Sequence, residues 1–277
     1  MKLLITAIGC PGFITIFNNI RFLFPDLEIH GCDVSKNINK EKVDSFFIVP
    51  NGNNKDYPDL ILEYCIKNKI SHLIPLSDEE IISIGKNIEK FEVNKIKIFG
   101  ESKPLIEDVF NKSFLNKELS DLNISPDFKV IKNCKDFCNA FNYFQSKNKK
   151  MCIKPSFSHG SRGFSIIEDV DYDYYLSKKS INKIPYDQFL KIIGERNINL
   201  VAMEFLPGEE YSVDAIMFNN VFYNIVRSRD ETINGISSKC TIKKNEDLKN
   251  ISKEIYEKFE FKYIVNIQFK KDLDGNL

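Results

Sequence analysis

The chain has 277 residues, of which 43% are hydrophobic and 28% charged, a composition typical of a globular protein of about two domains. Its 39 basic residues balance 39 acidic ones, which argues against a dedicated binder of nucleic acid or of an anionic membrane. Every apolar run is shorter than the roughly 18 residues that cross a membrane. The seven cysteines are scattered and odd in number, which indicates a reduced, cytoplasmic protein.

The first hundred residues alternate predicted strands and helices. Strands are predicted over 2–7, 27–32, 46–49, 72–76 and 95–99, and helices over 13–24, 58–67 and 78–91. Strands separated by helices indicate βαβ units and a mostly parallel sheet.

A glycine turn, Gly9 to Gly12, follows the first predicted strand, and Asp33 ends the second. This is the layout of a dinucleotide site, but Pro11 lacks an N–H donor and the third glycine of the fingerprint is missing. A tight strand-to-helix turn in a doubly wound domain explains the segment better. An NAD-dependent oxidoreductase therefore stays open only as a lesser alternative.

Beyond residue 103 the pattern changes to helices mixed with antiparallel strands. Helices are predicted over 105–122 with one break, 134–146, 171–196 and 248–259, and strands over 128–131, 151–154, 163–167, 200–205, 211–218, 221–228 and 263–271. Asn219 and Asn220 form a hairpin turn between two of these strands. We therefore predict an α/β, Rossmann-like domain over 1–103 and an α+β domain over 104–277.

A loop rich in glycine and serine runs from a strand end at Lys154 to Gly163. Backbone N–H groups of such a loop can wrap phosphate groups, and the lysine supplies a point charge. The lysine precedes the glycines and a strand follows them, so the segment is not a Walker loop. It predicts a phosphate-binding loop, with a plain surface hairpin as the alternative.

Two further segments predict a nucleotide site only when they are considered together with the loop. Residues 203–214 take one strand through a Pro207-Gly208 crossover into another, and such an extended segment can offer backbone groups to an adenine edge. A carboxylate just beyond it can accept ribose hydroxyls. Lys112 begins a predicted helix and, taken alone, is a solvated lysine.

Together these segments resemble the ATP-grasp superfamily, and most closely its carbamoyl-phosphate-synthase large-chain type. The stretch from Lys154 to Phe157 is especially similar, and Pro75 to Glu80 is typical of the preceding domain. The resemblance implies a pre-ATP-grasp domain over 1–103 and an ATP-grasp module over 104–277. It places a small lid at residues 125–205.

The resemblance also implies roles for particular residues. Lys112 and Lys154 match the basic residues that hold the ATP phosphates, and the loop that closes over them comprises Ser156, Ser158, His159, Gly160, Ser161, Arg162 and Gly163. Glu204, Phe205 and Leu206 match the adenine hinge, and Glu210 the ribose carboxylate. Gln268 matches a residue near the metals, and Arg227, Arg229 and Lys239 lie where relatives hold an acidic substrate or the γ-phosphate. His159 replaces the usual apolar residue of the loop.

The implied activity is an ATP-dependent ligase with ATP and Mg²⁺ as cofactors and a small carboxylate and an amine as substrates; a homodimer is also allowed. The family holds its Mg²⁺ ions with a strand that follows the hairpin matching Asp272 to Asn276, and we expect that metal-binding strand to be missing here. The chain is then expected to bind adenine nucleotide and turn it over poorly. The rival is a nucleotide-binding, non-catalytic or partner-dependent protein. Residues 156–163 are expected to be mobile without ligand.

Overall fold

The structure is a computed structural model that describes residues 1–36, 38–157, 163–171, 182–233 and 235–277. The chain forms two compact units, Met1–Glu107 and Asp108–Leu277, each of which has its own core. The predicted domains, 1–103 and 104–277, stay a prediction, and each unit is described by itself.

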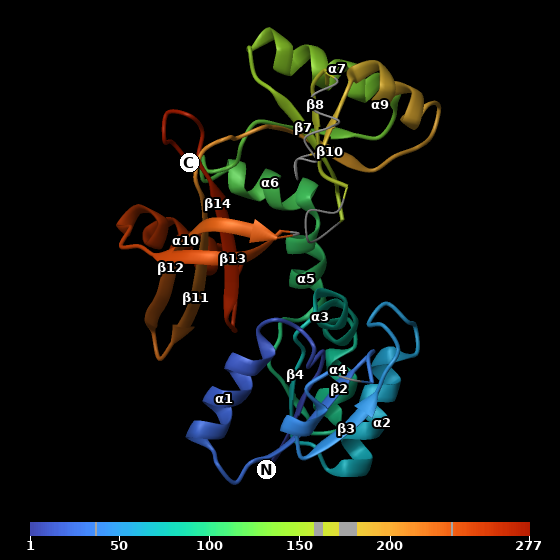
Figure 1. Cartoon of the computed structure of the whole chain (residues 1–277), viewed down its shortest axis with the longest axis vertical. Coiled ribbons are helices and arrows are strands. Elements are labelled where there is room, and N and C mark those ends of the chain that lie inside the picture. The colour runs from blue at the N-terminus through green and yellow to red at the C-terminus, as the bar shows by residue number, and fades with distance from the viewer. Residues whose placement is uncertain (37, 158–162, 172–181, 234) are drawn as a thin grey trace. The chain divides into compact units, whose positions relative to one another are not determined.

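Unit 1 contains a five-stranded parallel sheet (Figure 1). Its strands are β1 (Lys2–Ile5), β2 (Glu28–Asp33), β3 (Ser45–Ile48), β4 (His72–Ile74) and β5 (Lys97–Ile98), in the order β3-β2-β1-β4-β5. The order reverses between β1 and β4, as in a doubly wound sheet. Leu3 and Ile5 pack on the α1 side, and Leu4 packs on the α2 side, so both faces are covered. The predicted α/β fold is confirmed.

The helices of this region follow the expected order with one difference. They are α1 (Phe13–Leu23), the short η1 (Lys40–Lys42), α2 (Tyr57–Asn68), α3 (Asp78–Gly85), α4 (Ile88–Val93) and α5 (Lys103–Phe110). The single helix predicted over 78–91 is two helices. Gly85 lies where a Cβ atom would come 2.2 Å from the Ile106 side chain, and the Asn87 side chain donates to the Ser83 carbonyl oxygen at 2.9 Å. The tight packing and the competing hydrogen bond end α3 there.

The first sheet of unit 2 is mixed. Its strands are β6 (Phe128–Ile131), β7 (Met151–Pro155), β8 (Ser165–Ile167), β9 (Lys183–Ile184) and β10 (Leu200–Glu204), in the order β6-β10-β7-β8-β9. Helices α7 (Cys134–Ser146) and α9 (Tyr186–Ile193) pack on one face. The prediction of helix over 171–196 is wrong at β9, while 172–181 lie outside the described residues.

The second sheet of unit 2 is antiparallel. It consists of β11 (Glu210–Phe218), β12 (Val221–Ile233), β13 (Ile236–Ile242) and β14 (Val265–Lys270), in the order β13-β12-β11-β14, with α10 (Glu246–Lys258) packed on one face. Asn219 and Asn220 have φ values of 49° and 61°, the left-handed conformation that the predicted hairpin turn requires. β13 was not predicted, because its polar sequence carries no clear apolar alternation.

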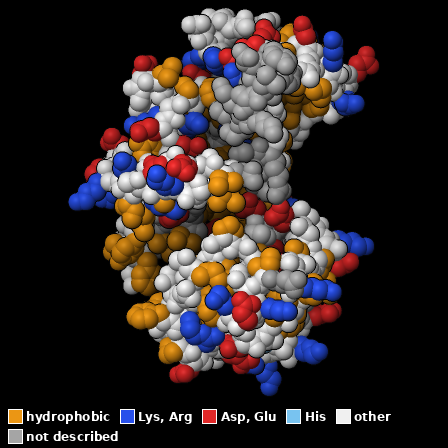
Figure 2. All heavy atoms as spheres, viewed as in Figure 1, with side chains coloured by type: hydrophobic (Ala, Val, Ile, Leu, Met, Phe, Trp, Pro, Cys, Tyr) orange, Lys and Arg blue, Asp and Glu red, His pale blue; other side chains and the backbone are white. Residues whose placement is uncertain are grey.

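The face of this sheet opposite α10 changes character along its strands. It is polar at the Glu210 end and apolar at the turn, where Phe218, Val221, Tyr223 and Ile225 are exposed (Figure 2). Helix α6 (Lys112–Ser120) connects the two sheets: Leu119 packs into the core beneath α10, and the Asn116 side chain contacts the Met203 sulfur at 3.9 Å.

Candidate nucleotide site

Ser156, at the end of β7, joins three segments that are distant in the sequence. It is only 1% exposed. Its N–H donates to the Asn199 carbonyl oxygen at 3.0 Å, and its hydroxyl donates to Asn199 Oδ1 at 2.8 Å. Its own carbonyl oxygen accepts the Lys112 N–H at 2.9 Å. This knot of hydrogen bonds fixes the start of α6 beside the end of β7.

The knot brings the two predicted phosphate lysines into one neighbourhood. Lys112 is the first residue of α6, which Asn111 caps by accepting from the Ser113 N–H at 3.1 Å. Lys154 lies on β7, with its ammonium nitrogen 5.7 Å from the centre of the Phe164 ring. Burial, and then the charge of Lys154, lower the pKa of Lys112 to about 8. Two like charges held this close favour a polyanionic ligand.

The loop between these lysines and β8 is described only at its ends. Ser158, His159, Gly160, Ser161 and Arg162 lie outside the described residues, and so does most of the segment expected to be mobile. Gly163 closes the loop with φ +74°, and a Cβ atom there would come 2.7 Å from Pro155. Only glycine fits this return into β8 without strain.

The predicted adenine hinge is held at its β10 end by two backbone hydrogen bonds. The Glu204 N–H donates to the Asp127 carbonyl oxygen at 2.9 Å, and the Phe205 N–H donates to the Lys150 carbonyl oxygen at 2.8 Å. The Glu204 carboxylate accepts from Lys149 at 2.6 Å, so it is bound by the protein itself. No hydrogen bond of the described residues uses the Leu206 N–H, which leaves that donor for a ligand.

An apolar layer covers the face of the mixed sheet that carries Lys154. Side chains alternate along β7, so Met151 and Ile153 pack under α7 while Cys152 points to the opposite face. This layer consists of Cys152, Ile166, Val201 and Met203, with Phe128, Phe164 and Phe205 packed against them. The first four residues are buried, whereas the three phenylalanine rings are only partly buried, so these rings are the apolar part of the layer that suits a purine ring joined to phosphates.

Glu210 and Arg229 lie side by side on the polar face of the antiparallel sheet. Arg229 has a side chain only 4% exposed, ion-paired with Glu210 and hydrogen-bonded to the Gly235 carbonyl oxygen and, at 2.9 Å, to the Ser237 hydroxyl. Lys270 lies 3.8 Å from the other Glu210 oxygen. Arg229 therefore orients Glu210, and its own donors already have protein partners.

The other two predicted substrate residues differ in burial. Arg227 is ion-paired with Asp214, and its Nε atom is buried without a hydrogen bond to the described part of the chain. Lys239 stands on the edge strand β13, 67% exposed, with Glu231 at 3.4 Å. The structure thus brings Arg227 to the centre of the polar face and leaves Lys239 at its rim.

Gln268, the predicted metal residue, lies exposed on β14 opposite Ser212. The carboxylates on the two neighbouring rows of β11 belong to Glu210, which is ion-paired with Arg229, and to Asp214, whose two oxygens accept from Arg227 and from Asn266. Mg²⁺ needs carboxylate oxygens that are not already neutralised. Among the described residues no cluster of three His, Cys, Asp or Glu could hold a metal, so these residues do not fit a Mg²⁺ site.

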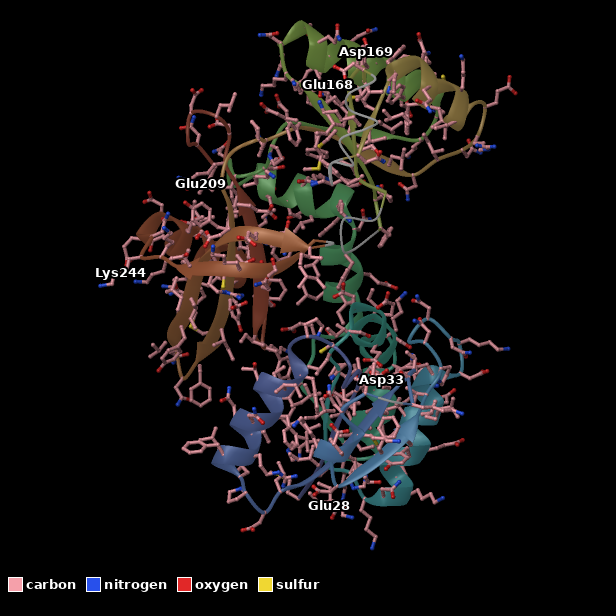
Figure 3. All side chains as sticks on the ribbon, viewed as in Figure 1. Glu28, Asp33, Glu168, Asp169, Glu209 and Lys244 are labelled. Carbon is pink, nitrogen blue, oxygen red and sulfur yellow. The ribbon has the colours of Figure 1, made fainter. Side chains whose placement is uncertain are left out.

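Asp33, the residue behind the NAD alternative, is labelled in Figure 3 and is hydrogen-bonded to the glycine turn that follows β1. Its carboxylate accepts from the Gly9 N–H at 2.8 Å and from the Ser35 N–H at 2.9 Å, and it is 6% exposed. A Cβ atom at Gly9 would come within 3.0 Å of this carboxylate. The glycine turn therefore serves the packing of β1 against β2, which favours the simpler explanation.

Sequence reasoning missed Asn199 and Lys149. Asn199 anchors Ser156 through both its backbone and its side chain, and Lys149 joins Glu204 to Asp127 at 2.6 and 3.0 Å. Neither residue stands in a motif. Their positions just before β10 and β7 were the only available signal, and it is weak.

The described residues form a groove of about 320 Å³. It is lined by Ser120, Asn123, Ser125, Pro126, Asp127, Phe128, Lys129 and Tyr143, none of which belongs to the predicted site. No helix in the described ranges combines the length and apolarity needed to cross a membrane.

Comparison with protein families gives two partial matches. Residues 196–277 match the family described as ATP-grasp in the biosynthetic pathway with Ter operon. Residues 18–99 match the PylC-like N-terminal domain. No curated protein matches the chain.

Several solved structures share the fold. N5-carboxyaminoimidazole synthetase from Staphylococcus aureus is 14% identical, with a TM-score of 0.68, covering 99% of this chain and 67% of that one. The biotin carboxylase domain of 2-oxoglutarate carboxylase from Hydrogenobacter thermophilus, solved as a dimer with MgADP, ADP and bicarbonate, is 14% identical at a TM-score of 0.68, covering 100% and 62%. L-amino acid ligase from Bacillus licheniformis is 12% identical at 0.64, covering 99% and 64%.

The chain therefore spans about two thirds of the length of these proteins, and identities this low show a common fold alone. The family matches cover part of each range, 1–103 and 104–277, in which the resemblance to ATP-grasp proteins was expected, and residues 100–195 lie outside both matches. Together with the shared fold, these matches show similarity to an ATP-grasp family over residues 196–277 and to the PylC-like N-terminal domain over residues 18–99.

Proposed function

We propose that this chain binds ATP in unit 2 and belongs to an ATP-dependent ligase that activates a carboxylate. The γ-phosphate of ATP would lie at Lys112 and Lys154, and the adenine ring would lie against the apolar layer with its edge at Glu204 and Leu206. Glu210, oriented by Arg229, would accept the ribose hydroxyls. Arg227 would face the acidic substrate.

The observation that carries this proposal is the Ser156 knot. It holds two lysines from distant segments close together, and burial, followed by the charge of Lys154, lowers the pKa of Lys112 to about 8. Two lysine side chains in one neighbourhood can both contact the phosphate groups of a single anionic ligand, which supports the proposal. The adjacent apolar layer and hinge select a ligand that also has a planar base.

The chemistry needs no protein nucleophile. A carboxylate oxygen attacks the γ-phosphorus, the bond to the β-phosphate oxygen breaks, and ADP leaves. The amine then attacks the acyl carbon and displaces phosphate. The lysines and loop amides align the reactants and offset phosphate charge, which is the main contribution of a protein to phosphoryl transfer. The described residues do not fit Mg²⁺, so no step is assigned to a metal.

Binding can be tested by thermal shift with ATP, GTP and NAD at equal concentration. Stabilisation by ATP above the other two supports the proposal, and stabilisation by NAD alone would overturn it. Ligase activity can be tested by phosphate release with panels of small carboxylates and amines. Release that requires both a carboxylate and an amine supports a ligase, whereas ATP binding without any release favours the nucleotide-binding, non-catalytic alternative.

The finer assignment to the carbamoyl-phosphate-synthase type rests on the stretch from Lys154 to Phe157 and stays a prediction. A homodimer and a cytoplasmic location also stay predictions. Size-exclusion chromatography with light scattering measures the first directly.

A further inference from the structure

The adenine hinge makes an unusually close contact with the loop that follows β14. A Cβ atom at Gly208 would lie 2.3 Å from the Asp272 carbonyl oxygen and 2.6 Å from that of Lys271. Two backbone hydrogen bonds fix the approach: the Gly208 N–H donates to the Lys271 carbonyl oxygen, and the Lys271 N–H donates to that of Glu209, both at 2.9 Å. Figure 3 labels Glu209 beside this loop. Any side chain at Gly208 would push the hinge away from its support.

The loop that follows β14 and contacts Gly208 is shaped by the carboxylate of Asp272. Asp272 Oδ1 accepts from the Asp274 N–H at 2.9 Å and from the Asn276 N–H at 2.8 Å, and Oδ2 accepts from the Asn276 amide at 3.0 Å. The Asp272 N–H also donates to the Asn276 carbonyl oxygen at 2.9 Å. The carboxylate folds the loop over residues 272–276 into a closed ring of hydrogen bonds. The Asp272 carbonyl oxygen, which a Cβ atom at Gly208 would meet, belongs to this ring, and the Lys271 carbonyl oxygen that accepts the Gly208 N–H directly precedes it.

We infer that Asp272 is a positioning residue for adenine recognition: it shapes the loop on which Gly208 sets the hinge. The inference rests on the proposed nucleotide site. The hinge enters the site from β10, where Asp127 and Lys150 hold it, and leaves at Gly208, where the loop holds it. With both ends fixed, the Leu206 N–H and the Glu204 carbonyl group keep one orientation toward the base. Without the loop, only the first end stays fixed.

With Asp272 in this role, the base and the phosphate chain of ATP are recognised by separate parts of the protein. The phosphate lysines depend on the Ser156 knot, which shares no residue with the Asp272 loop. Disturbing the loop should therefore weaken recognition of the base and leave binding of the phosphate chain unchanged. If Asp272 mattered only for the general stability of the protein, its substitution would weaken binding of the base and of the phosphate chain alike.

The test compares Kd values for ATP and for inorganic tripolyphosphate by isothermal titration calorimetry. The variants are Asp272→Ala, Asp272→Asn, Gly208→Ala and, as the matched control in the same loop, Asp274→Ala. For Asp272→Ala and Gly208→Ala we expect the Kd for ATP to rise about tenfold, which is about 1.4 kcal/mol. The Kd for tripolyphosphate should change less than about twofold, which also shows that each variant is folded. Asp272→Asn keeps an acceptor oxygen and should recover most of the affinity.

Three results would overturn the inference. In the first, Asp272→Ala behaves like Asp274→Ala toward ATP. In the second, both ligands weaken in parallel. In the third, Asp272→Asn is as impaired as Asp272→Ala. Wild-type protein that binds tripolyphosphate but no ATP, or neither ligand, would instead refute the proposed nucleotide site and the inference with it, so the two failures are distinguishable.

Discussion

The pKa of Lys112 makes nucleotide affinity sensitive to alkaline pH. The free protein, with a Lys112 pKa of about 8, is about 90% protonated at this group at pH 7 and about 10% at pH 9. If the charged form binds the phosphates, the apparent Kd is the intrinsic Kd divided by the charged fraction. We therefore expect the Kd for ATP to rise about tenfold between pH 7 and pH 9.

Calorimetry measures both this rise and its cause. At pH 8.5 the phosphates should restore the charge of Lys112, so binding takes up about 0.8 proton, which buffers of different ionisation enthalpy reveal. Lys112→Arg stays charged throughout and should bind with a flat pH profile. Lys117→Arg, on the exposed side of the same helix, is the control and should behave as wild type. A tenfold rise that persists in Lys112→Arg would refute the reasoning.

The same group affects the stability of the free protein in the opposite direction. The pKa of Lys112 is lower in the folded protein than its ordinary value of 10.5, because burial and Lys154 disfavour the charge. Between pH 8 and about 10.5 the unfolded chain therefore binds more protons, and the free energy of unfolding rises with pH. Relative to Lys112→Arg, ligand-free protein should gain thermal stability over the range in which it loses affinity.

Three further substitutions test the site. Lys154→Ala should weaken ATP binding by about ten- to a hundredfold, because one charge-assisted contact is lost, while the melting temperature stays nearly constant; unchanged affinity in calorimetry would contradict its role. Ser156→Ala should lower the free energy of unfolding in urea by about 1–2 kcal/mol and also weaken ATP binding. An effect on stability alone would show that the Ser156 hydrogen bonds do not support the nucleotide site. Arg229→Ala should cost about 3 kcal/mol because it breaks a buried pair, against less than about 0.5 kcal/mol for the exposed Lys239→Ala; equal costs in urea unfolding would show that burial does not distinguish them.

The parts of the fold that followed from the sequence are those with strong periodicity. The helix predicted over 134–146 is α7 to the residue, because an asparagine cap precedes a clear apolar stripe. The hairpin at Asn219 and Asn220 was equally readable, since consecutive left-handed residues favour asparagine. Doubly wound topology followed from the alternation of strands and helices. These features are set by local sequence.

The parts that did not follow depend on contacts between distant segments. β9 and β13 are strands because neighbouring strands pair with them, although their own residues carry no strand periodicity. Arg229 looked like an exposed ligand for an acidic substrate, and only the structure shows it 4% exposed and paired with Glu210. Local pattern reveals which residue types are present, whereas burial decides whether a charge is free for a ligand.

The proposed site is assembled from two supports that are independent in both sequence and structure. Ser156 joins β7 to α6 and sets the lysines, while Asp272 and Gly208 join β14 to the hinge and set the adenine edge. Mutations within one support should couple to each other, since they share hydrogen bonds, and mutations in different supports should add. The double variant Ser156→Ala with Asp272→Ala should therefore lose ATP affinity by the product of the two single losses. A combined loss that departs from that product by more than about twofold would show that the two ends of the site are coupled through the hinge.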